Sequence, residues 1–357
     1  MMRELTTRER MNRAYAHKEG DRVPMIDVPW TSTLARWQRE GMPREADFFE
    51  YFGLDLISKF DVDNSPRHPV QVMEESERFV VKTTPWGGTV KEIKDTVSSF
   101  EFVSYSVSDW DSWHTMKERM TPGRDRIPWS FLKANYPNWR EKGYWIRGRL
   151  TFGFDITKTL ITGDVFSLIS LIEDPELLMD MYNHELDICL ALMDQVWEAG
   201  YTFDEISWDD DVAYKQTQFF SKSMYRDILK PIHKRAVDWA HQKGIRAHMH
   251  SCGDITPFIF EFLDVGLDGL NPLEVKAGVD PVSVKKKYGD QILLRGGFDS
   301  YYWREFETAE AQLRERLPVM MKSGGYLFSS DHSIPDFVDL KTYQKILTLA
   351  KKIGAYE

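Results

Sequence analysis

The alternation of short apolar runs with helical patterns constrains the fold of this chain more than any other feature. Eight runs rich in apolar and β-branched residues recur, and each ends in polar residues and precedes a helical pattern. This alternation is typical of parallel strands joined by helices, and eight such units close a (β/α)₈ barrel. The predicted strands span residues 23–28, 54–62, 144–151, 203–208, 245–250, 269–272, 292–296 and 326–329.

The predicted fold class is therefore α/β, with one TIM-type barrel domain that takes up residues 1–357. An N-terminal helix precedes the barrel. It begins after Thr6, because Thr6 and Glu9 have the spacing of a capping box, and it ends near Gly20. The clearest further helices are predicted at residues 175–199, 223–244, 256–265, 281–288, 308–323 and 340–353.

Residues 64–138 do not follow the alternation. They contain a hairpin pattern, with strands at 78–84 and 89–93 around a turn at 85–88, and then a region rich in Trp and Pro. We expect an insertion after the second strand that folds over one face of the barrel. Eight of the 12 tryptophans precede residue 150. They either pack in the core and loops or form an aromatic wall over a ligand pocket.

Composition excludes several classes of function. Hydrophobic residues make up 42% and charged residues 29% of the 357 residues, which is ordinary for a globular protein and disfavours disorder or a membrane protein. A net charge of −10 lacks the basic field that nucleic acid requires. Two cysteines favour a reducing compartment, and the charged first ten residues lack a secretory pattern. We expect a cytoplasmic protein without nucleic-acid or membrane partners.

Polar side chains gather where the predicted strands end, which is where active sites of this fold are built. These residues are Asp27, Lys59, Asp61, Asp63, Arg147, Arg149, Asp209, Asp210, Asp211, His248, His250, Cys252, Asn271, Glu274, Asp299, Asp331 and His332. The carboxyl end of the barrel is therefore the predicted site. The sequence has no Gly-x-Gly-x-x-Gly or Walker pattern, so the usual nucleotide-binding motifs are absent.

The strongest local pattern is at residues 247–252, Ala-His-Met-His-Ser-Cys. Alternate side chains of a strand share a face, so His248, His250 and Cys252 are expected to point into the barrel at successive heights. Imidazole and thiolate are the donors that Zn²⁺ prefers, and catalytic zinc keeps three protein ligands and one open position. The third ligand must come from another strand, and His332 is the best candidate. Hydrogen-bonded histidines beside a buried cysteine are the alternative.

Several motifs follow one another along the chain in a characteristic order, namely Asp21-Arg22-Val23-Pro24, Asp209-Asp210, His250-Ser251-Cys252-Gly253-Asp254, Gly269-Leu270-Asn271-Pro272, Gly296-Gly297-Phe298-Asp299 and His332-Ser333-Ile334-Pro335. With these motifs in this order, the chain resembles the uroporphyrinogen decarboxylase superfamily, and most closely its zinc-dependent methylcobamide:coenzyme M methyltransferases. The resemblance covers nearly the whole chain, is weakest in the Trp-rich segment, and implies a (β/α)₈ barrel.

The resemblance implies a function and a ligand set. The methyltransferase branch binds zinc through His-x-Cys on one strand and a distant Cys near the last strand. His250 and Cys252 match the first two positions, and His332 stands at the third. The implied reaction moves a methyl group between a cobamide and a small thiol or methylated substrate, with zinc activating the thiol. The chain lacks a corrinoid-binding Asp-x-His-x-x-Gly motif, so a separate corrinoid protein is the expected partner.

One segment departs from the decarboxylase pattern. True decarboxylases carry an Arg-rich segment after the first strand, whereas residues 25–32 here contain no Arg and include Asp27. Uroporphyrinogen is therefore not the expected substrate. Two alternatives remain, a related lyase that uses Asp27 or Asp210 as acid or base on a smaller acid, and a binding barrel without turnover.

Glu274 is expected to support the zinc, either from its outer shell or as a fourth ligand that a thiol displaces. The sequence does not distinguish among four candidate substrates, which are coenzyme M, another thiol, a methylamine and a methoxylated aromatic compound. Of the three successive carboxylates at 209–211, one functional member in a solvated loop is expected, because three neighbours on a strand cannot all face one ion.

Overall fold

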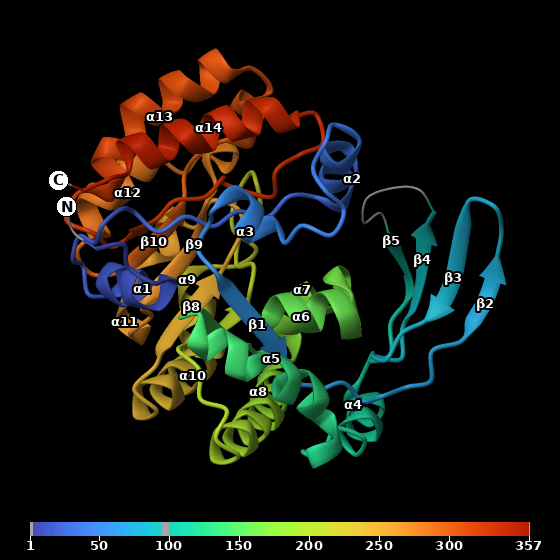
Figure 1. Cartoon of the computed structure of the whole chain (residues 1–357). Helices are drawn as coiled ribbons and strands as arrows, with labels where there is room; N and C mark the ends of the chain where they lie inside the picture. Colours follow the sequence, from blue (N-terminus) through green and yellow to red (C-terminus); the bar gives the residue numbers. More distant parts are fainter. Residues whose placement is uncertain (1–2, 95–99, 357) are drawn as a thin grey trace.

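The computed structural model describes residues 3–94 and 100–356. Its larger sheet has seven parallel strands in the order β1-β6-β7-β8-β9-β10-β11, and the sheet curls as in a TIM-type barrel (Figure 1). These strands coincide with seven of the eight predicted ones, so the α/β prediction is confirmed in this form. They are β1 (Ile57–Asp61), β6 (Trp145–Arg149), β7 (Glu205–Asp209), β8 (Arg246–His250), β9 (Gly269–Leu273), β10 (Leu293–Gly296) and β11 (Tyr326–Leu327).

The first predicted strand, residues 23–28, forms isolated bridges instead of a regular strand. Met25 bridges Phe328 in parallel, directly after β11, and the carbonyl of Met25 accepts a hydrogen bond of 2.8 Å from the backbone nitrogen of Asp55, shortly before β1. The segment thus lies between the two edge strands of the seven-stranded sheet. Its pairing is irregular because Pro24 and Pro29 have no backbone N–H to donate.

A buried ion cluster holds this segment against the N-terminal helix α1 (Thr7–Tyr15). The carboxylate of Asp55 is fully buried, and it pairs with Arg10 through one oxygen and with Arg22 at 2.7 Å through the other. The second oxygen also accepts the backbone N–H of Met25 at 2.7 Å. A buried charge is tolerated when it is paired and hydrogen-bonded, so Asp55 joins the helix to the segment that closes the sheet.

Helix α1 begins as predicted and ends early. The side chain of Thr6 accepts from the backbone of Glu9 and the side chain of Glu9 accepts from the backbone of Thr6, which is the predicted capping box. The helix stops at Tyr15 instead of near Gly20, because His17 takes a φ of 51° that a helix cannot contain.

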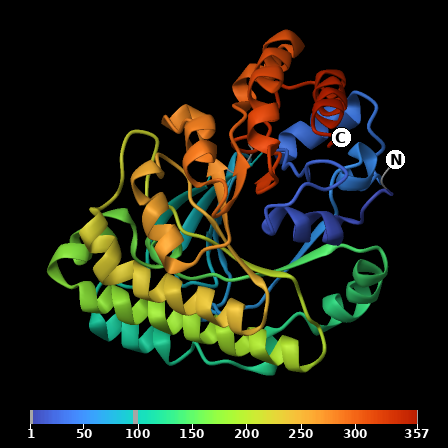
Figure 2. The same cartoon turned by 90° about the vertical axis from the view of Figure 1, so that its left-hand side faces the viewer.

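Helices surround the curled sheet, and the long helices α8 (Pro175–Glu198) and α10 (Lys230–Gln242) pack side by side (Figure 2). Among the residues described, no helix has the length and apolarity needed to span a membrane. The other helices are α2 (Thr31–Arg39), α3 (Phe48–Phe52), α4 (Trp110–Lys117), α5 (Trp129–Glu141), α6 (Phe154–Thr157), α7 (Asp164–Glu173), α9 (Lys222–Met224), α11 (Ile259–Val265), α12 (Pro281–Tyr288), α13 (Phe306–Met321) and α14 (Leu340–Ile353).

A second sheet of four antiparallel strands follows β1 and lies at the edge of the molecule (Figure 1). Its order is β2 (Val72–Glu75), β3 (Phe79–Thr83), β4 (Thr89–Ile93) and β5 (Phe100–Ser104). The predicted hairpin is β3 and β4, with Phe79 opposite Ile93. The strands β2 and β5 were missed because their side chains are mostly exposed, so neither strand forms a sustained apolar pattern. That this segment covers a face of the barrel stays a prediction.

Tryptophans in the first half of the chain mainly serve packing. Trp37, Trp113 and Trp145 are almost completely buried, and their indole N–H groups donate to Val338, Asp180 and Glu205 respectively. A buried indole with a satisfied N–H is a stable core group. The structure therefore favours the packing interpretation of the tryptophans over an aromatic wall.

Asp55→Ala tests the ion cluster. The variant leaves Arg10, Arg22 and the backbone N–H of Met25 without their shared acceptor, so we expect the free energy of unfolding to fall by about 3–5 kcal/mol in urea denaturation. The control is Lys142→Ala, which removes an exposed ion pair with Glu50 and is expected to change little. Equal losses in the two variants would contradict the role of Asp55.

Candidate active site

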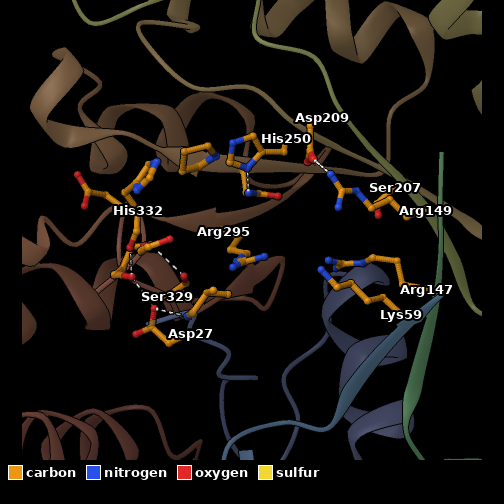
Figure 3. Close-up of a pocket in the computed structure, with 16 residues that line it drawn as sticks. Asp27, Lys59, Arg147, Arg149, Ser207, Asp209, His250, Arg295, Ser329 and His332 are labelled. Atoms are coloured by element: carbon orange, nitrogen blue, oxygen red, sulfur yellow. Dashed lines mark hydrogen bonds and ion pairs between the residues drawn. The ribbon is translucent and has the colours of Figure 1, made fainter. Parts of the chain in front are cut away.

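A cavity of about 230 Å³ opens at the carboxyl ends of the strands (Figure 3). It lies below the range of roughly 300–1,000 Å³ that is usual for drug-sized ligands, so it suits a small molecule and not a tetrapyrrole. None of the tryptophans lines it. The lining residues are Asp27, Val28, Lys59, Arg147, Arg149, Ser207, Asp209, His250, Asn271, Pro272, Arg295, Ser329, Ser330, Asp331, His332 and Ser333.

Three potential metal ligands come together where β7 and β8 end. Nε2 of His250 lies 3.1 Å from Sγ of Cys252. Asp211 accepts the backbone N–H of Cys252 at 2.7 Å. One ligand atom from each of these three residues lies within 4.8 Å of the other two. Asp209 pairs with His250 at the ends of the neighbouring strands β7 and β8, so the loops that follow these two strands begin side by side.

This donor set fits a zinc ion. It offers an imidazole, a thiol and a carboxylate, which are the groups that bind zinc in proteins. Burial lowers the pKa of His250 to about 4, so its imidazole is neutral, as a ligand must be. Burial and the nearby Asp211 and Glu274 raise the pKa of the Cys252 thiol. A divalent cation among these groups would compensate the crowded carboxylates and favour the thiolate.

His332 lines the same cavity but is not a member of this close group. It follows β11, and its side chain is exposed. Of the sequence-predicted ligands His250, Cys252 and His332, the two histidines line the cavity, and Cys252 lies beside His250 without lining it. Asp211 takes the third place in the close group. In the sequence, Asp211 was indicated only as a carboxylate that lies two residues beyond the end of β7. The role of His332 as a ligand stays a prediction.

Buried hydrogen bonds fix the imidazole of His250. Nδ2 of Asn271 lies 2.7 Å from Nδ1 of His250, and Oδ1 of Asn271 lies 2.6 Å from Nε2 of His248. Nδ1 of His248 lies 2.9 Å from the hydroxyl of Tyr15, which donates to Glu205 at 2.7 Å. His248 therefore stands behind His250, and Nε2 of His250 is left to face the thiol.

The three sequence-predicted catalytic carboxylates have different surroundings. Asp27 lines the cavity, whereas Asp210 does not and is hydrogen-bonded to His233 at 2.8 Å. Glu274 accepts the backbone N–H of Gly253 at 2.7 Å and so supports the turn after Cys252. The structure brings Glu274 close to the candidate metal ligands and leaves Asp210 outside the cavity.

Asp27 is buried beneath the cavity. Ser330 donates a hydrogen bond to one of its oxygens, and Tyr343 donates to the other at 3.3 Å. Burial raises the pKa of Asp27 from 3.8 to about 6, against the opposing effects of Ser330 and Arg295. An acid with such a pKa can both donate and accept a proton near neutral pH.

Four cationic side chains also line the cavity, namely Lys59, Arg147, Arg149 and Arg295 (Figure 3). Residues 25–32 contain no Arg, and the cations come from β1, β6 and β10 instead. Arg295 was missed altogether. Its signal was one charged residue in the otherwise apolar run of residues 292–296.

Comparisons with known proteins agree with the predicted family. Residues 162–353, more than half of the chain, match the family model described as uroporphyrinogen decarboxylase (URO-D). No curated protein matches this chain. A methyltransferase from Methanosarcina mazei is similar in structure, with a TM-score of 0.65, 17% identity, and coverage of 98% of this chain and 99% of that one. This likeness shows the fold.

A second solved structure is more distant. Xylanase 10B from Thermotoga petrophila RKU-1 gives a TM-score of 0.41 at 9% identity, over 99% of both chains.

Asp27→Asn tests the environment of Asp27. Because the folded-state pKa of about 6 exceeds the ordinary 3.8, the folded protein favours the protonated acid, and wild type loses this stability as pH rises from about 4 to above 6. The pKa difference corresponds to ~3 kcal/mol. We expect the melting temperature of Asp27→Asn relative to wild type to increase across this pH range. The exposed Asp111→Asn is the control, and a pH-independent difference would contradict the assignment.

Proposed function

The chain belongs to the uroporphyrinogen decarboxylase family, and from this premise we propose that it is a methyltransferase with its active site in the cavity at the carboxyl ends of the strands. The proposed reaction moves a methyl group between a cobamide on a partner corrinoid protein and a small thiol or methylated substrate. In the thiol direction, a carbon–sulfur bond forms, the bond from methyl to cobalt breaks with its electron pair left on cobalt, and the thiol proton is released.

The observation that carries this proposal is the close group of Asp211, His250 and Cys252. Zinc held there would favour the thiolate form of a bound thiol, which is the nucleophile. His250 and Cys252 are proposed ligands whether the third ligand is Asp211 or His332. Asp211 is favoured as the third donor over His332, because it lies within 4.8 Å of the other two donors. The fold shared with a methyltransferase at 17% identity is consistent with this function.

The chain's own residues orient and enclose the reacting groups. Asn271 fixes the ring of His250 through Nδ1, and Glu274 holds the backbone N–H that follows Cys252. The cavity of about 230 Å³ is too small for a corrinoid ring, so a partner would present the cobamide at its mouth. The exposed His332 lies on the cavity lining and is placed to contact what enters there.

A lyase that acts on a small carboxylic acid is the second candidate. Asp27 favours it, because a buried carboxyl with a pKa of about 6 shares the cavity with cationic side chains. Such an enzyme would need no metal. Metal content therefore separates the two candidate functions.

Elemental analysis tests the methyltransferase proposal. We expect about one zinc ion per chain after purification with zinc, and strong loss of zinc in His250→Ala and Cys252→Ala. Asp211→Asn is expected to weaken zinc binding more than His332→Ala does. Cys189→Ala is the matched control, because Cys189 is the other free cysteine, is buried, and donates to the carbonyl of Thr151.

If Cys252→Ala still contains one zinc ion per chain, the proposed site is ruled out. A larger loss in His332→Ala than in Asp211→Asn would assign the third position to His332. Methyl transfer to a thiol from a methylated cobamide, measured with the wild type and the same variants, then tests the activity itself.

A further inference from the structure

We propose that Lys59, Arg147 and Arg295 form a binding site for one oxyanion group, the carboxylate or sulfonate of a small acid that occupies the cavity. The three side chains point toward the same part of the cavity, and His250 lies across from them (Figure 3). The proposal rests on the proposed function only in naming this acid as the substrate. Binding of the oxyanion itself does not depend on zinc.

Register explains how the three cations meet. Lys59 and Arg147 are paired residues of the neighbouring strands β1 and β6, so their side chains point to the same face of the sheet. Arg295 comes from β10 and reaches the same cavity from another part of the curled sheet. Inward-pointing residues of such a sheet meet in layers, which brings cations far apart in sequence together.

Arg295 is the strongest evidence for the proposal. Within residues 3–94 and 100–356, its guanidinium has no hydrogen bond and no ion pair, although it is largely buried. The two acids whose charges act on Arg295, Asp27 and Glu205, already serve other donors. Asp27 accepts from Ser330 and Tyr343, and Glu205 pairs elsewhere. A buried cation without a partner is costly, so its five N–H donors call for an anion.

Arg147 is only half satisfied. Its Nε lies 2.5 Å from the carboxylate of Glu205, which balances one charge. Its Nη2 is buried and has no hydrogen-bond partner among the residues described. This guanidinium is therefore fixed in place by Glu205 while a donor remains free. A fixed planar guanidinium suits bidentate binding of a carboxylate or sulfonate.

Lys59 adds a second unbalanced charge. Its exposed ammonium group makes no hydrogen bond or ion pair in the described part of the chain. Arg149, the fourth cation of the cavity, differs because it pairs with Asp209 at 2.6 Å. The positive excess at Lys59 and Arg295 stands against a net charge of −10 for the whole chain. It is a local feature of the cavity and not a consequence of composition.

The ligand must be short. A cavity of about 230 Å³ holds a molecule of a few heavy atoms beside the cations. With its oxyanion on Arg147 and Arg295, the other end of a small acid extends toward His250 and the candidate metal group. A thiol or methylated acid of this kind satisfies the cations at one end and faces His250 at the other. Methylamines and uncharged methoxylated aromatics do not satisfy the cations.

Binding of simple probes to metal-free protein tests the proposal. We expect propionate or ethanesulfonate, measured by NMR titration after removal of metal with a chelator, to bind at least about tenfold more tightly than the uncharged propionamide. Arg295→Gln is expected to weaken binding of the charged probe by about tenfold or more. The tighter of the two acids identifies the oxyanion as carboxylate or sulfonate.

Arg246→Gln is the matched control, because Arg246 lies at the other end of β8 and pairs with Asp268 at 3.0 Å. It is expected to bind the probes like wild type. If Arg295→Gln does not fold, the exposed Lys59→Gln gives the same comparison. Absence of binding, equal binding of propionamide, or unchanged affinity in the cavity variant would overturn the proposal. Because these titrations contain no zinc, their failure is distinct from failure of the zinc analysis.

Discussion

The buried carboxylate of Glu205 holds two parts of the candidate site in place, the guanidinium of Arg147 and the imidazole of His250. It is fully buried in β7 and pairs with Arg147 on one side. On the other side it accepts from Tyr15, whose hydroxyl contacts His248, and the chain of hydrogen bonds continues to His250. One buried charge thus fixes a guanidinium that can bind an anion and an imidazole that can bind a metal. Arg147 nevertheless keeps a buried Nη2 without a hydrogen-bond partner among the residues described.

Most of the fold was predictable because its signals are local. Apolar runs and helical patterns located seven strands, and the predicted bounds of α12 and α14, 281–288 and 340–353, agree with the structure. The first strand proved irregular because its prolines cannot donate. The strands β2 and β5 carry exposed side chains, and their pairing depends on neighbours in the small sheet that no local pattern reveals.

The candidate site was predictable where it lies along one strand. Alternation placed His250 beside Cys252, and in the structure Asp27 lines the cavity. Two features required the tertiary structure. Asp210 is held outside the cavity by His233, which lies on helix α10, 23 residues further along the chain. Lys59, Arg147 and Arg149 were named at the ends of predicted strands, whereas Arg295 was missed, and its lack of a partner shows only once the neighbouring strands are in place.

The central claim is that one small acid binds at both ends. Its oxyanion binds the cations Lys59, Arg147 and Arg295, and its other end reaches the close group of Asp211, His250 and Cys252. Zinc K-edge absorption tests it directly by counting sulfur ligands on zinc-loaded protein. The account predicts one sulfur ligand, from Cys252, and a second on addition of 3-mercaptopropionate or 2-mercaptoethanesulfonate, but not of the cationic thiol cysteamine at the same concentration. An equal response to the acidic and the cationic thiols, or a zinc ion without sulfur, would contradict the account.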